Sequence, residues 1–295
     1  MTTKPTPDRI VVGVDLRGGS DHAVAAAVDL AARFEADLEL VHAVRPGRFG
    51  ATADTEQLAA ARHAVRIHLE ASLAGAILPW LEGERTLVVA AGHPAEVLLE
   101  RVRQPGTGLA VVGGHRRHGL LDLRNTTHSL MVRADCPVWV QEGQVRPVRR
   151  ILVPLDLSAE SLLALRAACR WAAAFEAEVL VLHCFVSPEL YGGHGMPVPG
   201  STHVVDRLRD EERAEFERVL AAFDWQGVAH ETVFVEDTPV AQIALLQDRV
   251  DLILLGTHGR TGLSALMLGN TAAAIVKESR VPVVTLRSPE RAWLL

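Results

Sequence analysis

The sequence has few cysteines, few aromatic residues and no long apolar run. Its three cysteines, Cys136, Cys169 and Cys184, form no Cys-x-x-Cys pair, which argues against a disulfide framework and fits a reducing compartment. No uninterrupted run of about 18 apolar residues is present, so no membrane span is predicted. Residues 1–8 are polar and lack the apolar core of a signal peptide. These absences predict a cytoplasmic protein that makes no membrane contact.

An excess of one sign of charge is also missing. The 295 residues carry a formal net charge of −6, so no nucleic-acid partner is expected, although residues 115–118 form a short basic run. Hydrophobic residues make up 48% of the chain, which is enough for buried cores and too much for disorder. At roughly 150 residues per domain, the length predicts two domains.

Signatures of catalysis are absent as well. The sequence contains no Walker lysine motif, nucleophile elbow or His-Glu-x-x-His motif. His183 and Cys184 are adjacent in a predicted strand, where neighbouring side chains face opposite sides, so they are poorly placed as a catalytic pair. The glycine-rich residues 17–21 are interpreted as a loop that begins a helix. We therefore expect no catalytic residues and no metal site.

What is present is one pattern written twice. Residues 9–16 match residues 150–157, so that Asp15 corresponds to Asp156 at an offset of 156 − 15 = 141. The same offset carries residues 34–37 onto 175–178. The halves meet in a polar segment near residue 146. The repeat predicts two domains, residues 1–145 and 146–295.

Each half alternates apolar, β-branched runs with helical patterns, which favours an α/β fold. Two tandem, doubly wound, five-stranded parallel sheets are predicted, with ligands beyond the carboxyl ends of the strands. Helix N-caps are expected at Ser20 or Asp21 and at Ser158. The expected strands are residues 10–14, 38–44, 86–90, 109–112 and 138–141 in the first half, and 151–155, 179–185, 231–235, 252–255 and 281–286 in the second.

The strongest functional signal is the stretch 251–271. An apolar strand runs into a first cluster, Gly256 to Gly259, and a second cluster begins at Gly269. Glycines let the backbone approach an anion, and free amides at a helix N-terminus favour negative charge. A simple turn and helix cap would also use such glycines, but the second cluster favours a phosphate site. Hydrogen bonds or charge for a phosphate can come from Thr257, Arg260, Thr261, Asn270 and Thr271.

Asp156, the spacing Gly256-x2-Gly259-x9-Gly269-Asn270 and the last strand, residues 281–286, resemble the universal stress protein family. The duplication resembles its tandem members of the actinobacterial type. The resemblance covers about residues 9–287 and implies a Rossmann-like fold similar to adenine nucleotide alpha hydrolases. It also implies ATP as ligand, with Mg held only through the nucleotide phosphates. In the family the last strands pair across a dimer, so we expect them to pair between the halves here, and we expect a homodimer.

The resemblance also implies site residues. The adenine and ribose would lie at Asp156 and at the backbone of Pro154 and Leu155. The phosphates would lie at Gly256, Thr257, His258, Gly259, Arg260, Thr261, Gly262, Gly269, Asn270 and Thr271. The corresponding residues of the first half are Gly13, Asp15, Gly113, Gly114, His115, Arg117, Asn125 and Thr126.

The first half departs from the motif. Arg116 stands where Gly259 stands, and Arg124 stands where Gly269 stands. If these glycines need a positive φ, each replacement costs about 1–2 kcal/mol. The arginines can return part of this cost through charge-assisted bonds to phosphate. We therefore predict a competent second-half site and a weaker first-half site with a degraded glycine loop.

Together these observations predict an ATP-binding, stress-response regulatory protein. Its nucleotide state would modulate an interaction with an unknown protein partner or an assembly state. Two alternatives stay open, a slow ATPase or nucleotidyl-transfer enzyme and a scaffold with vestigial sites. A dehydrogenase that binds NAD is disfavoured because no Gly-x-Gly-x-x-Gly follows either first strand.

Overall fold

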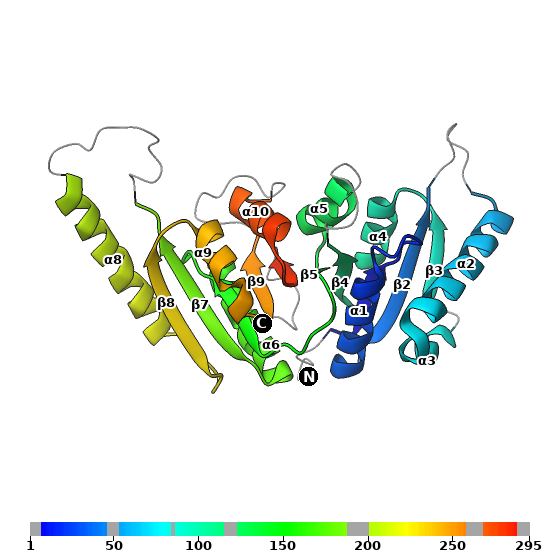
Figure 1. The fold of residues 1–295 in the computed structure, drawn as a ribbon, viewed down its shortest axis with the longest axis horizontal. Helices are drawn as coiled ribbons and strands as arrows, with labels where there is room; N and C mark the ends of the chain where they lie inside the picture. Colours follow the sequence, from blue (N-terminus) through cyan, green and yellow to red (C-terminus); the bar gives the residue numbers. More distant parts are fainter. Residues whose placement is uncertain are drawn as a thin grey trace.

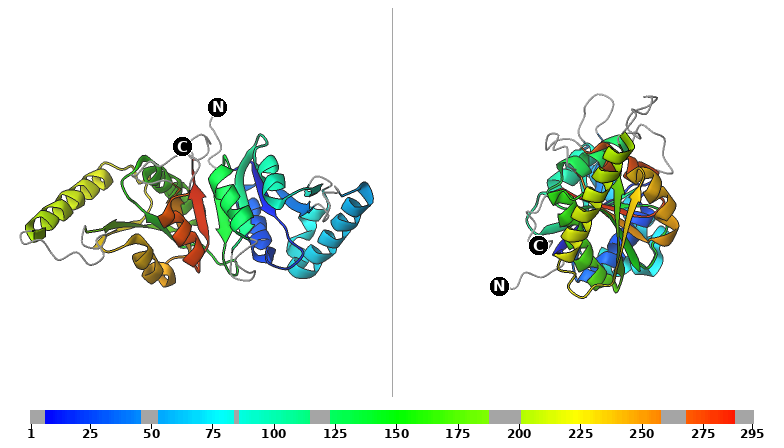
Figure 2. Two further views of the ribbon diagram at one scale, coloured as in Figure 1. Left: turned by 90° about the horizontal axis from the view of Figure 1, so that it is seen from above. Right: turned by 90° about the vertical axis from the view of Figure 1, so that its left-hand side faces the viewer.

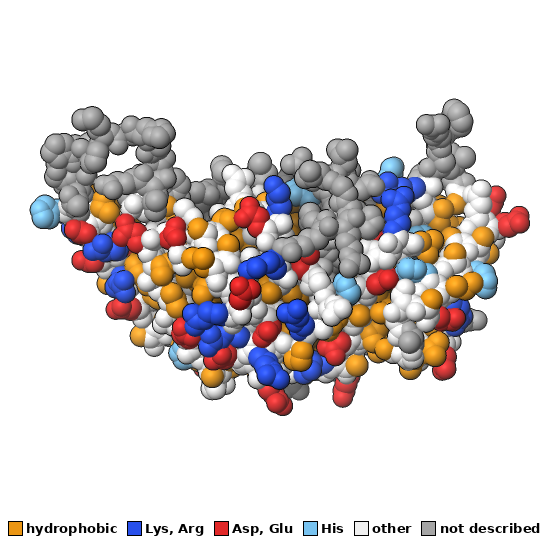
Figure 3. All heavy atoms as spheres, in the orientation of Figure 1, with side chains coloured by type: hydrophobic (Ala, Val, Ile, Leu, Met, Phe, Trp, Pro, Cys, Tyr) orange, Lys and Arg blue, Asp and Glu red, His pale blue; other side chains and the backbone are white. Residues whose placement is uncertain are grey.

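The chain folds as an α/β protein in which helices cover both faces of one sheet (Figure 1). The computed structural model describes residues 7–45, 53–83, 86–114, 123–187, 201–257 and 268–287. Within this described part of the chain, no helix is both long enough and apolar enough to cross a membrane. On the face shown in Figure 3, acidic and basic side chains are interspersed rather than gathered by sign.

The two halves share one alternation of five strands with helices, to which the first half adds η1 and α3 before β3 and the second half adds η2 before β9. The first half comprises β1 (Arg9–Gly13), α1 (Asp21–Phe34), β2 (Asp37–Val44), α2 (Thr55–Leu73), η1 (Ala74–Ala76), α3 (Leu78–Leu81), β3 (Leu87–Ala91), α4 (Pro94–Val102), β4 (Thr107–Gly113), α5 (Leu123–Arg133) and β5 (Val138–Gln141). The second half comprises β6 (Arg150–Pro154), α6 (Ala159–Phe175), β7 (Glu178–Phe185), α8 (Ser201–Ala221), β8 (His230–Glu236), α9 (Pro239–Leu246), η2 (Gln247–Arg249), β9 (Leu252–Gly256), α10 (Asn270–Glu278) and β10 (Val283–Leu286). All ten predicted strands are present.

The strands form a single ten-stranded sheet in the order β3-β2-β1-β4-β5-β10-β9-β6-β7-β8. Within each half all pairings are parallel, whereas β5 and β10 pair antiparallel, with Trp139 opposite Val284. The predicted fold class and the predicted pairing of the last strands are therefore confirmed. Seen from above, the halves lie end to end and meet at these two strands (Figure 2).

The hydrophobic core also runs through both halves. One buried layer lies under α1, α2, α6 and α8, and the other lies under α4, α5, α9 and α10. An aromatic cluster crosses the junction in the first layer. Trp139 of β5 stacks on Trp171 of α6 with ring centroids 5.7 Å apart, and Phe34 of α1 lies 6.2 Å from the same ring. The halves are thus joined by packing as well as by strand pairing.

The first helix starts differently in the two halves. Ser158 caps α6 as predicted, because its hydroxyl accepts a hydrogen bond from Ser161 N at 3.2 Å. Ser20 stands at the N-cap position of α1 as predicted, but its side chain caps no helix amide; its hydroxyl instead accepts from Asp15 N at 2.8 Å. The start of α6 corresponds to Gly18 (159 − 141 = 18), whose φ of +75° lies outside a helix. A glycine-rich loop therefore replaces the first turn in the first half.

Candidate functional site

The candidate site in each half lies where the strand order reverses. In the strand order β3-β2-β1-β4-β5, the chain continues from β1 toward β2 on one side and from β4 toward β5 on the other. This reversal opens a crevice at the carboxyl ends of β1 and β4. The same arrangement occurs between β6 and β9 in the second half. Asp15 lies two residues beyond Gly13, the last residue of β1, and Asp156 lies two residues beyond Pro154, the last residue of β6. The predicted carboxylates are therefore at the switch points.

Asp156 is fixed by the residues that start α6. Its Oδ1 accepts from Ser158 N at 3.0 Å and from Ser158 Oγ at 2.5 Å. Leu157 between them has a φ of +65°, a conformation that costs a non-glycine residue of order 1 kcal/mol or more. The two hydrogen bonds from Ser158 hold the carboxylate between the β6 end and the first turn of α6 and help to offset this cost.

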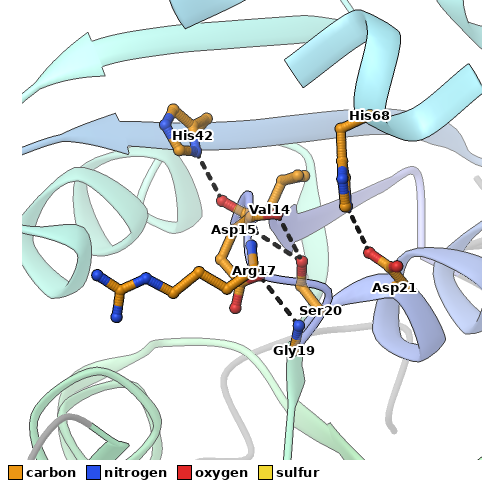
Figure 4. A network of polar contacts seen from close by, with 8 residues as sticks. All are labelled: Val14, Asp15, Arg17, Gly19, Ser20, Asp21, His42 and His68. Carbon is orange, nitrogen blue, oxygen red and sulfur yellow. Dashed lines mark hydrogen bonds and ion pairs between the residues drawn. The ribbon is translucent and has the colours of Figure 1, made fainter. Parts of the chain in front are cut away.

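Asp15 is held by a wider loop in the first half. Its Oδ1 accepts from Arg17 N at 2.9 Å and from Gly19 N at 3.1 Å, while its own amide donates to Ser20 (Figure 4). Gly113 at the end of β4 packs against this loop so closely that a Cβ there would lie 2.5 Å from Gly19 O. Glycine at position 113 therefore allows the end of β4 to approach this loop closely.

A cavity of about 390 Å³ lies at this edge of the first half. Of the residues predicted for the first-half site, five line it. They are Gly13, Asp15, Gly113, Gly114 and Thr126. The remaining lining residues come from the loop after β1, the end of β2 and the residue after it, α4, the end of β4 and the start of α5. The structure therefore brings these predicted residues around one space.

In the second half, the two glycine clusters meet. Gly269 N donates to Thr257 O at 3.0 Å, and Gly269 stands at the N-cap of α10. A Cβ on Gly269 would lie 3.2 Å from that same oxygen, and a Cβ on Gly256 would lie 3.0 Å from the backbone of Glu160 in α6. Because β6 and β9 are neighbours, this junction lies beside the strand that carries Asp156.

The premise that the glycine at position 269 needs a positive φ is wrong, and Gly259, the other glycine of that premise, lies outside the described residues. Gly269 has a φ of −58°, and Gly256 is not in the left-handed region either. The space around them, rather than their backbone conformation, requires glycine. The backbone cost predicted for Arg124 at the position of Gly269 therefore does not arise.

Several predicted site residues lie outside the described residues. These are His115, Arg117, His258, Gly259, Arg260, Thr261 and Gly262, together with Arg116 of the comparison between halves. Asn125 is described only as a backbone position of α5. Among the residues that the structure does describe, no group of three or more His, Cys, Asp and Glu side chains is placed to hold a metal ion.

Histidines on the second strand of each half bind the ends of the first strands. His42 donates from Nδ1 to Val14 O at 2.9 Å, and His183 donates from Nδ1 to Leu155 O at 2.7 Å (Figure 4 shows the first). Their spacing, 183 − 42 = 141, repeats the offset of the aspartates. Although the sequence shows this correspondence, it gave no reason to assign the histidines a role beside the site.

The second helix of each half is tied to the site by another histidine contact. In the first half, His68 of α2 lies 2.8 Å from Asp21 Oδ1 at the start of α1 (Figure 4). In the second half, His183 Nε2 lies 3.0 Å from Glu212 Oε1 of α8. Cys184 faces the opposite side of β7, which confirms that it does not pair with His183, and burial raises the pKa of its thiol to about 12.

This doubly wound sheet, repeated twice with a carboxylate at each switch point, is the architecture of a nucleotide-binding class of α/β proteins. Residues 7–141 and 147–287 each match the model of the universal stress protein family. The chain therefore belongs to the universal stress protein family, with two copies of its domain.

Known relatives support this membership along the whole chain. Universal stress protein Rv2005c of Mycobacterium tuberculosis is 27% identical over 300 residues, which cover 94% of this chain and 96% of that protein. Universal stress protein MJ0531 of Methanocaldococcus jannaschii is 32% identical over 147 residues, covering 48% of this chain and 84% of that protein. The mycobacterial match confirms the prediction of a tandem member of the actinobacterial type.

A solved structure shares the complete fold. A universal stress protein from Archaeoglobus fulgidus superposes with a TM-score of 0.60 and 16% sequence identity. The match covers 97% of this chain and 98% of that one. At this identity, the likeness establishes the fold.

Proposed function

We propose that the second half binds ATP at the carboxyl ends of β6 and β9, and that this binding regulates an interaction or an assembly of the protein. The observation that carries the proposal is the hydrogen bond from Gly269 N to Thr257 O, which joins the two glycine clusters beside the strand of Asp156. Family membership and the N-terminus of α10 at this junction support it further.

The proposed roles follow from chemistry. Asp156 and the backbone of Pro154 and Leu155 hydrogen-bond the ribose and the adenine. The phosphates lie against Gly256, Thr257 and the start of α10, where amides and the helix dipole favour negative charge. His258, Gly259, Arg260, Thr261 and Gly262, which lie outside the described residues, are proposed from the sequence alone as further phosphate contacts. Any Mg is held through the phosphates.

The first half, residues 1–145, is proposed as a second and weaker site. Its cavity of about 390 Å³ offers room for a nucleoside, and Asp15 occupies the place that corresponds to Asp156. Its glycine loop differs from that of the second half, residues 146–295, through Arg116 and Arg124.

The regulatory role is preferred to catalysis because no catalytic set appears in the sequence. Steady release of product above the uncatalysed rate, lost in Asp156→Ala, would favour the alternative of a slow ATPase or nucleotidyl-transfer enzyme. A protein of this kind is proposed to work in the cytoplasm as a homodimer with a protein partner still to be found. Sedimentation with and without ATP tests the assembly directly.

Calorimetry with ATP on matched variants tests the proposed site. Asp156→Ala is expected to weaken ATP binding at least tenfold, because a charged hydrogen bond contributes about 1.5–3 kcal/mol and about 1.4 kcal/mol is a factor of ten. Asp224→Ala is the control. Asp224 likewise accepts from the amide two residues on, Gln226 N at 3.0 Å, but it lies in the loop before β8 at the opposite edge of the sheet. Equal affinities in both variants would remove the basis of the proposal.

A further inference from the structure

We propose that Glu142 makes the first-half site select ligands with little or no phosphate, whereas the second half takes the triphosphate. This inference rests on the proposed function and adds a ligand preference to each half. It arises from one position at which the two halves carry opposite charges, Glu142 and Arg287.

Backbone hydrogen bonds establish that these two residues correspond. The first residue after β4, Gly114, donates its amide to Gln141 O at 2.7 Å. The first residue after β9, Thr257, donates its amide to Leu286 O at 2.9 Å. Gln141 ends β5 and Leu286 ends β10, so the residues that follow them occupy matching places. In the first half that place holds a carboxylate, and in the second half a guanidinium.

The carboxylate of Glu142 lies directly against the start of the first-half glycine loop. A Cβ built on Gly114 would overlap this carboxylate, so the carboxylate would have to move if residue 114 carried a side chain. Glu142 is 6% exposed, and Gly114 lines the 390 Å³ cavity together with Thr126 and Thr127. A buried anionic side chain therefore lies against Gly114, which lines the cavity and corresponds to Thr257, a residue of the proposed phosphate site.

The second half has no carboxylate at the matching place. There the Arg287 guanidinium donates to Val132 O at the end of α5, and Thr257 occupies the position of Gly114. The two sites thus share their carboxylates after the first strand, Asp15 and Asp156, but differ in the charge of the residue that follows the last strand. The phosphate is therefore the part of the ligand for which the two sites would differ in affinity.

Like charges make this difference large enough to measure. At an effective dielectric constant of about 20, a unit charge several ångströms away shifts a binding equilibrium by roughly tenfold or more. Glu142 also engages other groups of the protein, and a phosphate in the same place would compete for them. Both effects act against polyphosphate and leave an uncharged nucleoside unaffected.

Hydrogen exchange resolved by peptide tests the inference on the full chain. Adenosine, AMP and ATP are titrated, and protection of residues 15–20 reports the first half while protection of residues 156–161 reports the second. In the native protein we expect the first half to bind adenosine at least tenfold more tightly than ATP. Glu142→Gln is expected to strengthen ATP binding there at least fivefold, with adenosine binding and the second half unchanged.

Arg287→Glu is the reciprocal variant. It is expected to weaken ATP binding in the second half at least fivefold without changing ATP binding in the first half. If Glu142→Gln does not fold, this variant still tests whether the charge at this position determines the affinity for ATP. First-half binding of adenosine combined with ATP affinity that Glu142→Gln leaves unchanged would overturn the inference alone. No protection of either half by any of the three ligands would overturn the proposed function, and the inference with it.

Discussion

At the scale of the residue, the glycines of the site are required by their neighbours. Gly256 faces the backbone of Glu160, Gly269 faces Thr257 O and Gly113 faces Gly19 O. None of the three has a left-handed φ. The glycine motif therefore packs a strand end onto the start of a helix, and this close packing brings the β9 end and the α10 start together.

Gly256→Ala is expected to destabilise the fold by about 1–3 kcal/mol, the usual cost of overpacking. The new methyl group would meet the backbone of Glu160 at 3.0 Å, which the rigid start of α6 cannot easily relieve. Gly75→Ala is the control, because its Cβ would meet nothing within 4 Å. Urea unfolding of both variants measures the difference, and equal stabilities would contradict the packing argument.

The thiols of Cys169, which is buried, and Cys184, which is partly buried, are expected to be inert in the folded protein. Burial raises the pKa of Cys169 to about 11 and that of Cys184 to about 12, so little thiolate forms at pH 8. Iodoacetamide should modify them only after unfolding in urea. Because the unfolded thiols ionise near pH 9 and the folded ones only well above it, the free energy of unfolding should fall as the pH rises above about 9. Rapid alkylation of either thiol in the native state would contradict this account.

At the scale of the element, α8 is fastened by one buried histidine. The ring of His183 lies between Phe216 of α8 and Phe234 of β8, each with centroids 5.2 Å away, and its side chain is 2% exposed. One nitrogen binds Leu155 O of the site strand and the other binds Glu212. The position of α8 is thereby linked to the backbone proposed to hold the adenine.

Glu212→Ala should loosen α8 and cost about 1–3 kcal/mol, because it leaves a buried ring nitrogen without its partner. Glu211→Ala is the control, since Glu211 is exposed and lies 3.7 Å from Arg207 in a surface pair worth less than about 1 kcal/mol. Hydrogen exchange along residues 201–221 measures how much each of the two variants loosens α8. If the two variants exchange alike, His183 does not anchor the helix.

The sequence predicted an element well where neighbouring residues determine its structure, and poorly where contacts with distant residues determine it. Apolar runs predicted every strand, and Ser158 predicted the start of α6, because both depend on neighbouring residues. Ser20 looked equally like a cap, but its hydroxyl is taken by Asp15 N across a glycine loop. The carboxylate of Glu142 against Gly114 could not be predicted, since it depends on how two strand ends meet in space.

At the scale of the whole molecule, the pairing of β5 with β10 makes one sheet from two repeats. Trp139 lies at the junction and stacks on Trp171 of the other half. Both core layers contain residues of both halves. The apolar last strands predicted this pairing, because each alone would leave an exposed sheet edge.

Trp139→Ala is therefore expected to cost about 3–5 kcal/mol and to destabilise both halves together. Trp225→Ala is the control, because Trp225 stacks on His230 within the second half and is only partly buried. Thermal unfolding followed by hydrogen exchange in each half distinguishes the two. Loss of stability confined to the first half in Trp139→Ala would show that the halves fold independently.

The central claim, that the second half is the principal ATP site, is tested most directly by native mass spectrometry of the full chain titrated with ATP. The mass increments count the nucleotides bound to each chain. We expect one ATP per chain at low concentration, its loss in Asp156→Ala, and a second ATP only at a much higher concentration. No bound ATP, or two ATP molecules that bind together at the same concentration, would contradict the claim.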